Sequence, residues 1–133
     1  QTPTFGPTGQ FDVELELAFV VGRAGDGPVA VEEFREHVLG VVLLNDWSAR
    51  DIQAWESRPL GPFLGKSFAT SISATVTPLA LLENARVAAP PQDPPPLPYL
   101  DGGRDWALDV ELELESNGEV VSRPNARDSL KYS

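Results

Sequence analysis

The sequence predicts an α+β fold, or a mixed-β one, that is rich in strands and has only short helices. Two observations lead to this fold class. Residues 11–21 and 106–115 alternate apolar and polar side chains with period two, which is typical of strands that bury one face. Asn117-Gly118 then favours a tight type I′ turn, so a hairpin with residues 119–121 is expected. Strand and helix patterns show no regular βαβ alternation.

The first third of the chain is expected to contain two strands and a helix. Residues 11–21 place apolar side chains on one face of a strand and acidic side chains on the other. Residues 31–39 carry apolar side chains at helical spacing, and Gly40 is expected to stop that helix. Residues 41–44 form a short apolar run, which indicates a buried strand.

The middle of the chain is expected to hold one short helix and one further strand. Ser48 with Asp51 three residues later resembles a capping box, which predicts a helix over residues 49–56. Prolines at positions 59 and 62 then end this helix. Residues 68–76 are rich in Ser, Thr, Ile and Val, which favours a strand.

The later part of the chain is less regular. Residues 79–83 suit one or two helical turns. The six prolines of residues 90–98 favour an extended, polyproline-like crossover outside any sheet interior. Residues 125–133 read like the first turns of a helix. Since the chain has no Met, we expect residues 1–133 to be a single partial domain of a longer chain.

Composition excludes several classes of function. The net charge is −10, which argues against nucleic acid because binding there depends on Lys and Arg. No apolar run approaches the roughly 18 residues of a membrane span, so no membrane partner is expected. The absence of Cys excludes disulfides and thiolate metal sites. Excess carboxylate suits a hard cation such as Mg²⁺ or Ca²⁺, and equally suits a plain acidic surface.

Two glutamates of the first strand form a candidate metal-binding pair. Glu14 and Glu16 point to the same strand face, with Cα atoms ~6.6 Å apart at the usual rise per residue. Two carboxylates at that spacing can converge on one divalent cation, although a solvated strand face has the same pattern. The hexapeptide Asp-Val-Glu-Leu-Glu-Leu occurs twice, at residues 12–17 and 109–114. Local spacing therefore leaves both interpretations open for each copy.

Two longer segments separate these interpretations. Residues 45–56 read Asn-Asp-Trp-Ser-Ala-Arg-Asp-Ile-Gln-Ala-Trp-Glu, and residues 59–70 read Pro-Leu-Gly-Pro-Phe-Leu-Gly-Lys-Ser-Phe-Ala-Thr. Together they resemble the signature of the fumarylacetoacetase family. Trp47, residues 59–64 and residues 92–100 favour this family over its acylpyruvase, decarboxylase and isomerase relatives. The resemblance extends over nearly the whole chain.

The resemblance implies a set of metal-site residues. The family holds its metal, Mg²⁺ and/or Ca²⁺, with an acidic pair of the form Asp-x-Glu-x-Glu upstream of the signature, which here selects the first copy of the hexapeptide. The second copy, with Glu111 and Glu113, falls where the family has no ligands and is expected to be surface. The residues implied at or beside the metal are Glu14, Glu16, Asp46, Lys66 and Thr70.

The resemblance also implies the groups that act on the substrate. Arg50, Gln53 and Lys66 match the donors that stabilise an oxyanion, and Gln53 and Lys66 also contact the substrate. Ser57 stands where the family has a substrate-contacting Tyr, and Ala69 stands where it has Gly. The family's catalytic His and its first metal-binding Asp would lie upstream of this chain, and further pocket residues downstream of it. His37 does not match the catalytic position and is expected to be structural.

The implied activity is hydrolysis of a carbon–carbon bond in a small diketo acid. The family cleaves 4-fumarylacetoacetate to fumarate and acetoacetate, the last step of tyrosine and phenylalanine degradation. The resemblance further implies a mixed β-roll, a homodimer and a cytoplasmic location, with the 133-residue chain inactive alone. Two alternatives stay open: an acylpyruvase or decarboxylase of the same superfamily, and a non-enzymatic acidic, cation-binding domain.

Overall fold

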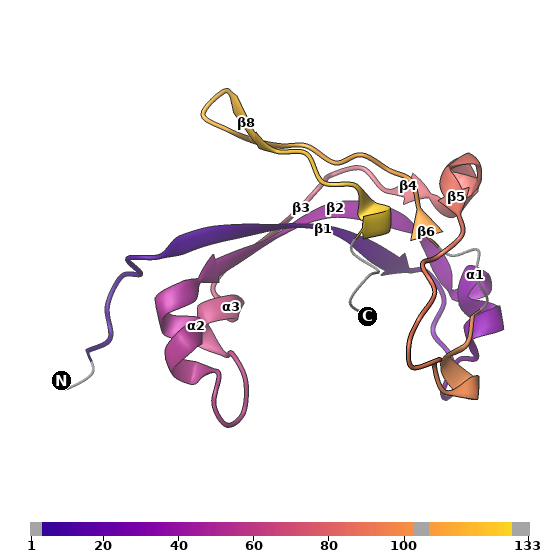
Figure 1. The fold of residues 1–133 in the computed structure, drawn as a ribbon, viewed down its shortest axis with the longest axis horizontal. Helices are drawn as coiled ribbons and strands as arrows, with labels where there is room; N and C mark the ends of the chain where they lie inside the picture. The colour runs from indigo at the N-terminus through magenta and orange to yellow at the C-terminus, as the bar shows by residue number, and fades with distance from the viewer. Residues whose placement is uncertain (1–3, 103–106, 129–133) are drawn as a thin grey trace. The chain divides into compact units, whose positions relative to one another are not determined.

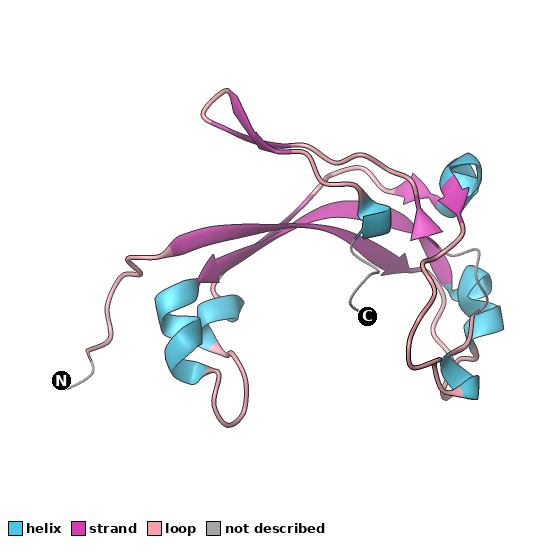
Figure 2. Cartoon of the chain, in the orientation of Figure 1, coloured by secondary structure: helices cyan, strands magenta, loops and turns pink. Residues whose placement is uncertain are grey.

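The computed structural model describes residues 4–102 and 107–128 of the chain. These residues fold into two compact units, one made of residues 4–16 with Leu43–Ala74 and the other of Leu17–Val42 with residues 75–102 and 107–128. Strands and short helices alternate irregularly along the chain (Figures 1 and 2), which agrees with the predicted strand-rich α+β class. Within the described ranges, no helix is both long enough and apolar enough to cross a bilayer.

The helices and strands of the described residues are all short except the first two strands. In chain order they are β1 (Phe11–Val21), the 3-10 helix η1 (Val31–Glu33), α1 (Phe34–His37), β2 (Val38–Ala49), α2 (Arg50–Glu56), α3 (Leu64–Ser67), β3 (Thr70–Ile72), β4 (Thr77–Pro78), η2 (Leu79–Ala85), β5 (Arg86–Val87), η3 (Pro98–Leu100), β6 (Ala107–Leu108), β7 (Leu114–Ser116) and β8 (Glu119–Ser122).

β2 is the central strand of the largest sheet. It lies between β1 and the pair β3 and β4, in the order β1-β2-β3 with β4 also on β2. The β3 pairing is antiparallel and sets Asp46 opposite Thr70. The β4 pairing is antiparallel and sets Gly40 opposite Pro78. Two further two-stranded sheets, β5-β6 and β7-β8, lie outside this one.

The first strand has the predicted bounds but not the predicted buried face. None of its residues is buried, and Phe11 and Phe19 are 59% and 50% exposed. Each ring instead contacts aromatic neighbours within its own unit, and Phe11 has a second one in Phe68 with ring centroids 6.2 Å apart. Phe11 stacks on Trp47 with ring centroids 5.0 Å apart, and Phe19 meets Phe34 edge-on at the same separation.

The predicted helix over residues 31–39 is shorter than expected. Its helical turns end at His37, and Val38 and Leu39 already belong to β2. Gly40 therefore does not stop a helix; it lies within the strand. The reason is a close approach of two backbones, because a Cβ at Gly40 would overlap the carbonyl of Thr77. Pairing with β4 overrides the apolar spacing of the preceding residues.

The helix predicted after the signature's serine forms, but its predicted capping box does not. α2 begins at Arg50 with Ala49 as its N-cap and without a side-chain cap. The Ser48 hydroxyl is buried and donates to the Asp46 carbonyl at 3.1 Å. Asp51 instead accepts hydrogen bonds from the Thr8 hydroxyl and the Gly9 amide, which tie the N-terminal segment to α2.

The predicted strand over residues 68–76 is broken into two pieces. β3 ends at Ile72 and β4 begins at Thr77. At Ser73 the side-chain oxygen, rather than a carbonyl, accepts the Leu43 amide at 3.2 Å, which interrupts the regular ladder. The helical turns expected at 79–83 are confirmed as η2, and residues 90–97 lie in neither strand nor helix, as their prolines require.

The predicted hairpin is confirmed, whereas the strand before it is fragmented. Asn117 and Gly118 both have positive φ, 54° and 83°, as a type I′ turn needs, and β7 pairs with β8 across them. The expected strand over 106–115 is present only as β6, an isolated bridge at Glu111 and β7; Trp106 lies outside the described residues. Residues 126–128 form one 3-10 turn, and the rest of the helix expected over 125–133 lies outside the description.

Candidate metal centre

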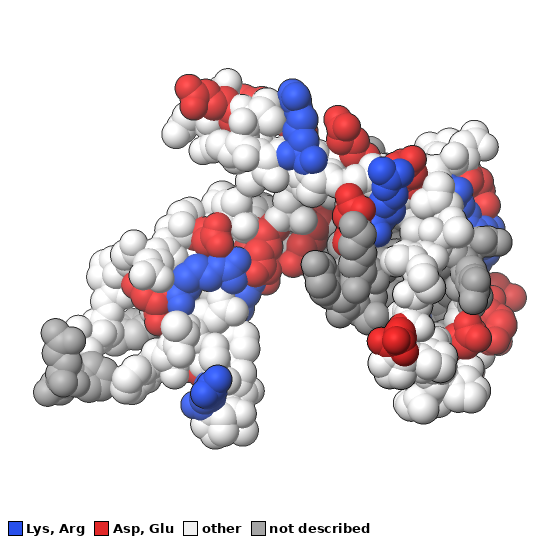
Figure 3. Space-filling view, in the orientation of Figure 1, with Lys and Arg blue, Asp and Glu red and all other residues white. Residues whose placement is uncertain are grey.

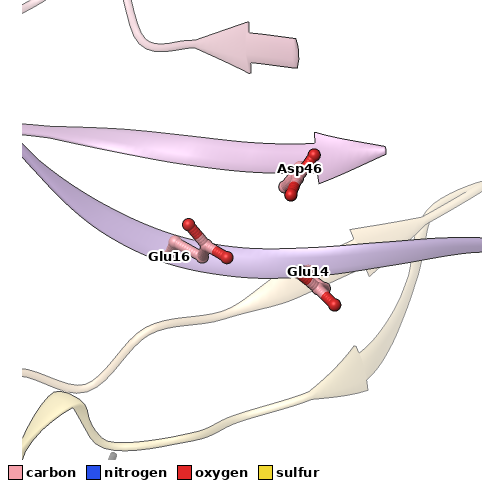
Figure 4. A group of neighbouring side chains, drawn as sticks. All are labelled: Glu14, Glu16 and Asp46. Carbon is pink, nitrogen blue, oxygen red and sulfur yellow. The ribbon is translucent and has the colours of Figure 1, made fainter. Parts of the chain in front are cut away.

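Three carboxylates of the first unit gather at one place on the sheet. Glu14 and Glu16 lie on β1 and Asp46 lies on the neighbouring strand β2 (Figure 4). One carboxylate oxygen from each residue lies within 4.8 Å of the others, and this is the one such acidic group found among the described residues. The structure thus brings together the three acidic residues that the sequence singled out.

Strand geometry explains how these side chains meet. Residues two apart on a strand point to the same face, so β1 presents Glu14 and Glu16 together. The strand predicted over residues 41–44 extends to Ala49, so Asp46 lies inside β2, three residues before its end. There it is paired in register with Thr70 of β3, so this residue lies next to Asp46 on the adjacent strand.

Lys66 supplies a cation beside the acidic group. It lies in α3, and its ammonium contacts a carboxylate oxygen of Glu14 and, at 3.0 Å, one of Asp46. Only 17% of the Lys66 side chain is exposed. Burial alone would lower the pKa of Lys66, but its hydrogen bonds to the two carboxylates outweigh burial and raise it. Lys66 therefore carries its charge at neutral pH.

Arg50 closes the other side of the acidic group. Its Nε donates to Asp12 at 2.8 Å, and its Nη1 lies 2.8 Å from Glu14 and donates to Gln53 at 2.9 Å. The hydrogen bond from Arg50 is the main cause that lowers the pKa of Asp12. Burial acts to raise the pKa of Glu14, but hydrogen bonds from Lys66 and Arg50 hold it below its usual value. Both carboxyl groups are therefore ionised well below neutral pH.

Glu16 forms no ion pair with a Lys or Arg within residues 4–102 and 107–128. Burial, followed by the negative charges of Glu14 and Asp46, raises the pKa of Glu16. A carboxylate that is held in an unfavourable negative field is one that a cation stabilises. Together with Glu14 and Asp46, Glu16 offers three carboxylate oxygens, the ligands that hard divalent cations prefer. The donor set therefore fits a metal such as Mg²⁺ or Ca²⁺.

Charges around this group are closely interleaved. In Figure 3 the larger blue patch over the region of α2 and α3 lies directly against red acidic side chains, whereas the smaller blue patch below it is surrounded mostly by white. The ion pairs of Arg50 and Lys66 account for this pattern. Positive side chains thus lie at the acidic group even though the whole chain has a net charge of −10.

The second copy of the hexapeptide has a different environment. Glu111 and Glu113 are both exposed, and neither belongs to an acidic group of the kind formed by the first copy. Arg123 donates to Glu113 at 2.7 Å, and Glu111 only bridges the backbone of Asn125. An identical local sequence therefore gives a converging pair in one place and a solvated surface in the other.

The remaining predicted residues lie on α2 and α1. Gln53 is three residues after Arg50, and their hydrogen bond confirms that the two share one face of α2. Ser57 follows α2 and donates its hydroxyl to the Gln53 carbonyl at 2.6 Å. His37 belongs to the other unit, where its Nδ1 lies 2.9 Å from the Arg23 carbonyl oxygen.

Two carboxylates at this centre were not assigned a role from the sequence. Asp12 positions the Arg50 guanidinium, and its place two residues before Glu14 on the same strand face was a usable signal. Glu56 binds the backbone amides of residues 63–65. No sequence pattern marks that contact, because its partners are main-chain groups.

Comparison with known sequences identifies the family. The model described as "Fumarylacetoacetate (FAA) hydrolase C-terminal" matches residues 1–131 of this chain. The chain belongs to the fumarylacetoacetate hydrolase family. The strand-rich sheets and the acidic group on β1 and β2 are thus the fold and the candidate metal centre of a member of this family.

Individual proteins that are similar to this chain are named fumarylacetoacetase. The chain is 48% identical to the fumarylacetoacetase of Homo sapiens over 135 residues, which is 98% of this chain and 32% of that protein. It is 48% identical to the fumarylacetoacetases of Rattus norvegicus and Arabidopsis thaliana, with 91% and 95% of this chain covered and 29% of each relative. The chain thus spans about a third of the length of these relatives.

Proposed function

We propose that this chain forms the metal-binding part of a hydrolase that cleaves a carbon–carbon bond in 4-fumarylacetoacetate. The products would be fumarate and acetoacetate, as in the last step of tyrosine degradation. The observation that carries the proposal is the convergence of Glu14, Glu16 and Asp46 beside the ammonium of Lys66. Similarity to fumarylacetoacetases over nearly the whole chain supports the choice of substrate.

The proposed metal site uses Glu14, Glu16 and Asp46 as ligands, with Lys66 and Thr70 beside them. A divalent cation held there would supply a Lewis acid that polarises the carbonyl under attack. We propose Mg²⁺ and/or Ca²⁺, because all three ligands are carboxylates. Asp12 and Arg50 keep Glu14 in place from one side, and Lys66 does so from the other.

The proposed oxyanion donors are Arg50, Gln53 and Lys66. The Nη2 group of Arg50 and the Nε2 group of Gln53 have no hydrogen-bond partner among the described residues. Among the described residues, Asn45 Oδ1 is the one buried side-chain nitrogen or oxygen that lacks a hydrogen-bond partner. Since the Arg50 Nη2 and Gln53 Nε2 groups also lack a partner but are not in this buried class, both donors are accessible. A donor aimed at a developing oxyanion typically contributes ~3 kcal/mol to lowering the barrier.

The proposed reaction consumes one water. Water adds to the carbonyl carbon of the fumaryl group, and its proton passes to a base that the family resemblance places outside these residues. Arg50, Gln53 and Lys66 hold the resulting oxyanion by hydrogen bonds. When the oxyanion re-forms its carbonyl, the carbon–carbon bond breaks, fumarate is released and the acetoacetate enolate takes up a proton. The 133-residue chain alone is expected to be inactive.

The repeated hexapeptide supplies a matched test of the metal site. In the full-length protein, Asp46→Asn and Glu14→Gln should each lower kcat/KM for fumarylacetoacetate by at least about 10–100-fold, the range that even outer partners of metal ligands contribute. Glu111→Gln, at the position of the second copy that corresponds to Glu14, should leave kcat/KM unchanged. Undiminished turnover of Asp46→Asn in saturating Mg²⁺ would remove Asp46 from the mechanism.

A second candidate is a different diketo acid substrate, and Ser57 favours testing it. Its hydroxyl is bonded to the Gln53 carbonyl, so this position offers the substrate neither an aromatic ring nor a phenol. A panel of fumarylacetoacetate, acylpyruvates and a decarboxylase substrate separates the activities. Hydrolysis of an acylpyruvate with the higher kcat/KM would assign the chain to that branch of the superfamily.

A further inference from the structure

The carboxylate of Glu56 holds the start of α3. Both of its oxygens are used: Oε2 accepts the amides of Phe63 at 2.8 Å and Gly65 at 3.0 Å, and Oε1 accepts the amide of Leu64 at 2.9 Å. No side chain next to α3 in sequence caps its first turn. Glu56 is the last residue of α2, so these bonds join the end of one helix to the beginning of the other.

Gly65 makes the same junction close. A Cβ at this position would lie 2.7 Å from the Gln53 amide nitrogen and 2.9 Å from the Gln53 Cα, so only glycine lets the two backbones approach this far. Gly65 is buried, and α2 and α3 lie side by side (Figures 1 and 2). The contact and the hydrogen bonds of Glu56 together fix the position of α3 on α2.

The position of Lys66 depends on this contact between α2 and α3. It is the third residue of α3, immediately after Gly65, and its ammonium bonds to Glu14 and Asp46. We infer that Glu56 is a positioning residue for Lys66: its bonds to α3 hold the ammonium against the acidic group and at the oxyanion. The inference rests on the proposed function for the role of Lys66, and Glu56 itself contacts neither metal nor substrate.

The negative charge of Glu56 suits this role. Its hydrogen bonds from the amides of Phe63, Gly65 and Leu64 lower the pKa of Glu56, the first of them most, so it is ionised at neutral pH. Hydrogen bonds to a charged acceptor are roughly twice as strong as those between neutral groups. Gln at this position keeps one acceptor oxygen, whereas Ala keeps none, so the two substitutions form a graded series.

A double-mutant cycle tests the inference in the full-length protein. Lys66→Met should lower kcat by about 100-fold or more, as for loss of one oxyanion donor. Glu56→Ala should lower kcat by about 10–100-fold, with a smaller loss in Glu56→Gln, because misplacing a catalytic group by about 1 Å has effects of this size. If Glu56 acts through Lys66, adding Glu56→Ala to Lys66→Met should cost almost nothing more.

Asp51 provides the matched control. It is also a carboxylate of α2 that accepts backbone amides, but its donors are the Thr8 hydroxyl and the amides of Gly9 and Ile52, none of which lies in α3. The effects of Asp51→Asn and Lys66→Met on kcat should therefore multiply. Multiplying effects of Glu56→Ala and Lys66→Met would overturn the inference, and so would a Glu56→Gln variant that is folded and loses as much kcat as Glu56→Ala.

Chemical labelling separates this inference from the proposed function. The Lys66 side chain is 17% exposed, so an amine-acylating reagent should modify it slowly. Peptide-resolved mass spectrometry should show faster labelling of Lys66 in Glu56→Gln and Glu56→Ala but not in Asp51→Asn. This readout needs no substrate, so an inactive wild-type protein would refute the proposed function alone. An unchanged labelling rate in Glu56→Ala would refute the positioning role alone.

Discussion

At the scale of residues, the candidate centre has more carboxylates than cations, and its two cations, Arg50 and Lys66, do not contact every carboxylate. Glu14 is bonded to Arg50 through one oxygen and to Lys66 through the other. Glu16, two residues further along the same strand face, has neither contact, and its pKa is raised while that of Glu14 is lowered. Ionisation of Glu14 therefore stabilises the folded chain, whereas ionisation of Glu16 two residues away destabilises it.

Replacement of Glu16 by Gln should raise the stability of the protein at pH 7 in the absence of divalent cations. Because the folded-state pKa of Glu16 lies above its ordinary value of 4.5, folding is penalised once this carboxyl ionises. The gain should be at most about 1 kcal/mol, since exposed charges are screened. Below pH 4.5 the carboxyl is protonated in the folded and the unfolded chain, so the gain should vanish.

Added Mg²⁺ should make the wild type more stable than the Glu16→Gln variant. A cation that binds only the folded state stabilises it more when it binds more tightly, and Glu16→Gln removes one ligand, so the wild type should gain more. Thermal unfolding at pH 4 and pH 7, with and without saturating Mg²⁺, measures both effects. Glu113→Gln is the control, because Glu113 occupies the same place in the second hexapeptide and forms an ion pair with Arg123. An equal Mg²⁺-induced shift in wild type and Glu16→Gln would exclude Glu16 as a ligand.

Sequence analysis could propose the acidic residues but could not choose between the two hexapeptides by itself. Glu14 and Glu111 have identical neighbours for several residues, and only the longer signature at residues 45–70 favoured the first. The difference lies in what pairs alongside: β1 is followed in the sheet by β2 with Asp46, whereas Glu111 has one isolated bridge. Such long-range pairing is absent from any local pattern.

At the scale of elements, the presence of strands was predicted better than the residues at which they begin and end. β1 has the predicted bounds because period two persists over its whole length. The hairpin turn was predictable because Asn117-Gly118 accepts positive φ at both positions. The helix over residues 31–39 was predicted too long, since Val38 and Leu39 have helical spacing but pair within the sheet. Tertiary pairing, rather than local preference, sets these boundaries.

Gly40 is the residue at which this pairing should be most sensitive. A Cβ there would overlap the Thr77 carbonyl, a main-chain group that cannot rotate away, so Gly40→Ala should separate β2 from β4. Introducing excess atoms into a close-packed contact typically costs 1–3 kcal/mol. Chemical denaturation of the full-length protein measures the loss.

Gly27→Ala is the matched control for this substitution. A Cβ at Gly27 meets nothing within 4 Å, and its φ is not in the left-handed region. This variant should therefore match or slightly exceed the stability of the wild type, because Ala restricts the unfolded chain. Equal stabilities of Gly40→Ala and Gly27→Ala would show that β2 and β4 do not approach as closely as described.

At the scale of the whole chain, little apolar surface is covered. The buried hydrophobic side chains among the described residues are Val38, Val41, Val42, Ala49, Ala107 and Leu112. Many large apolar side chains are exposed, among them Trp55 at 73% and Leu60 at 79%. Folding has to offset roughly 1–2 kcal/mol of backbone entropy per ordered residue, and burial of apolar surface is the main compensation. The isolated 133-residue chain should therefore be marginally stable.

Such a chain is expected to self-associate, because exposed apolar patches and unpaired strand edges favour contact between molecules. Sedimentation velocity over a range of concentrations should show a mass that grows with concentration. Trp55→Ser together with Leu60→Ser should reduce this growth without lowering the unfolding midpoint, since both side chains are more than 70% exposed. Val42→Ser, at a residue only 6% exposed, should instead lower the midpoint and increase association. A concentration-independent monomer with a cooperative unfolding transition would show that the small core is sufficient for an independently stable fold.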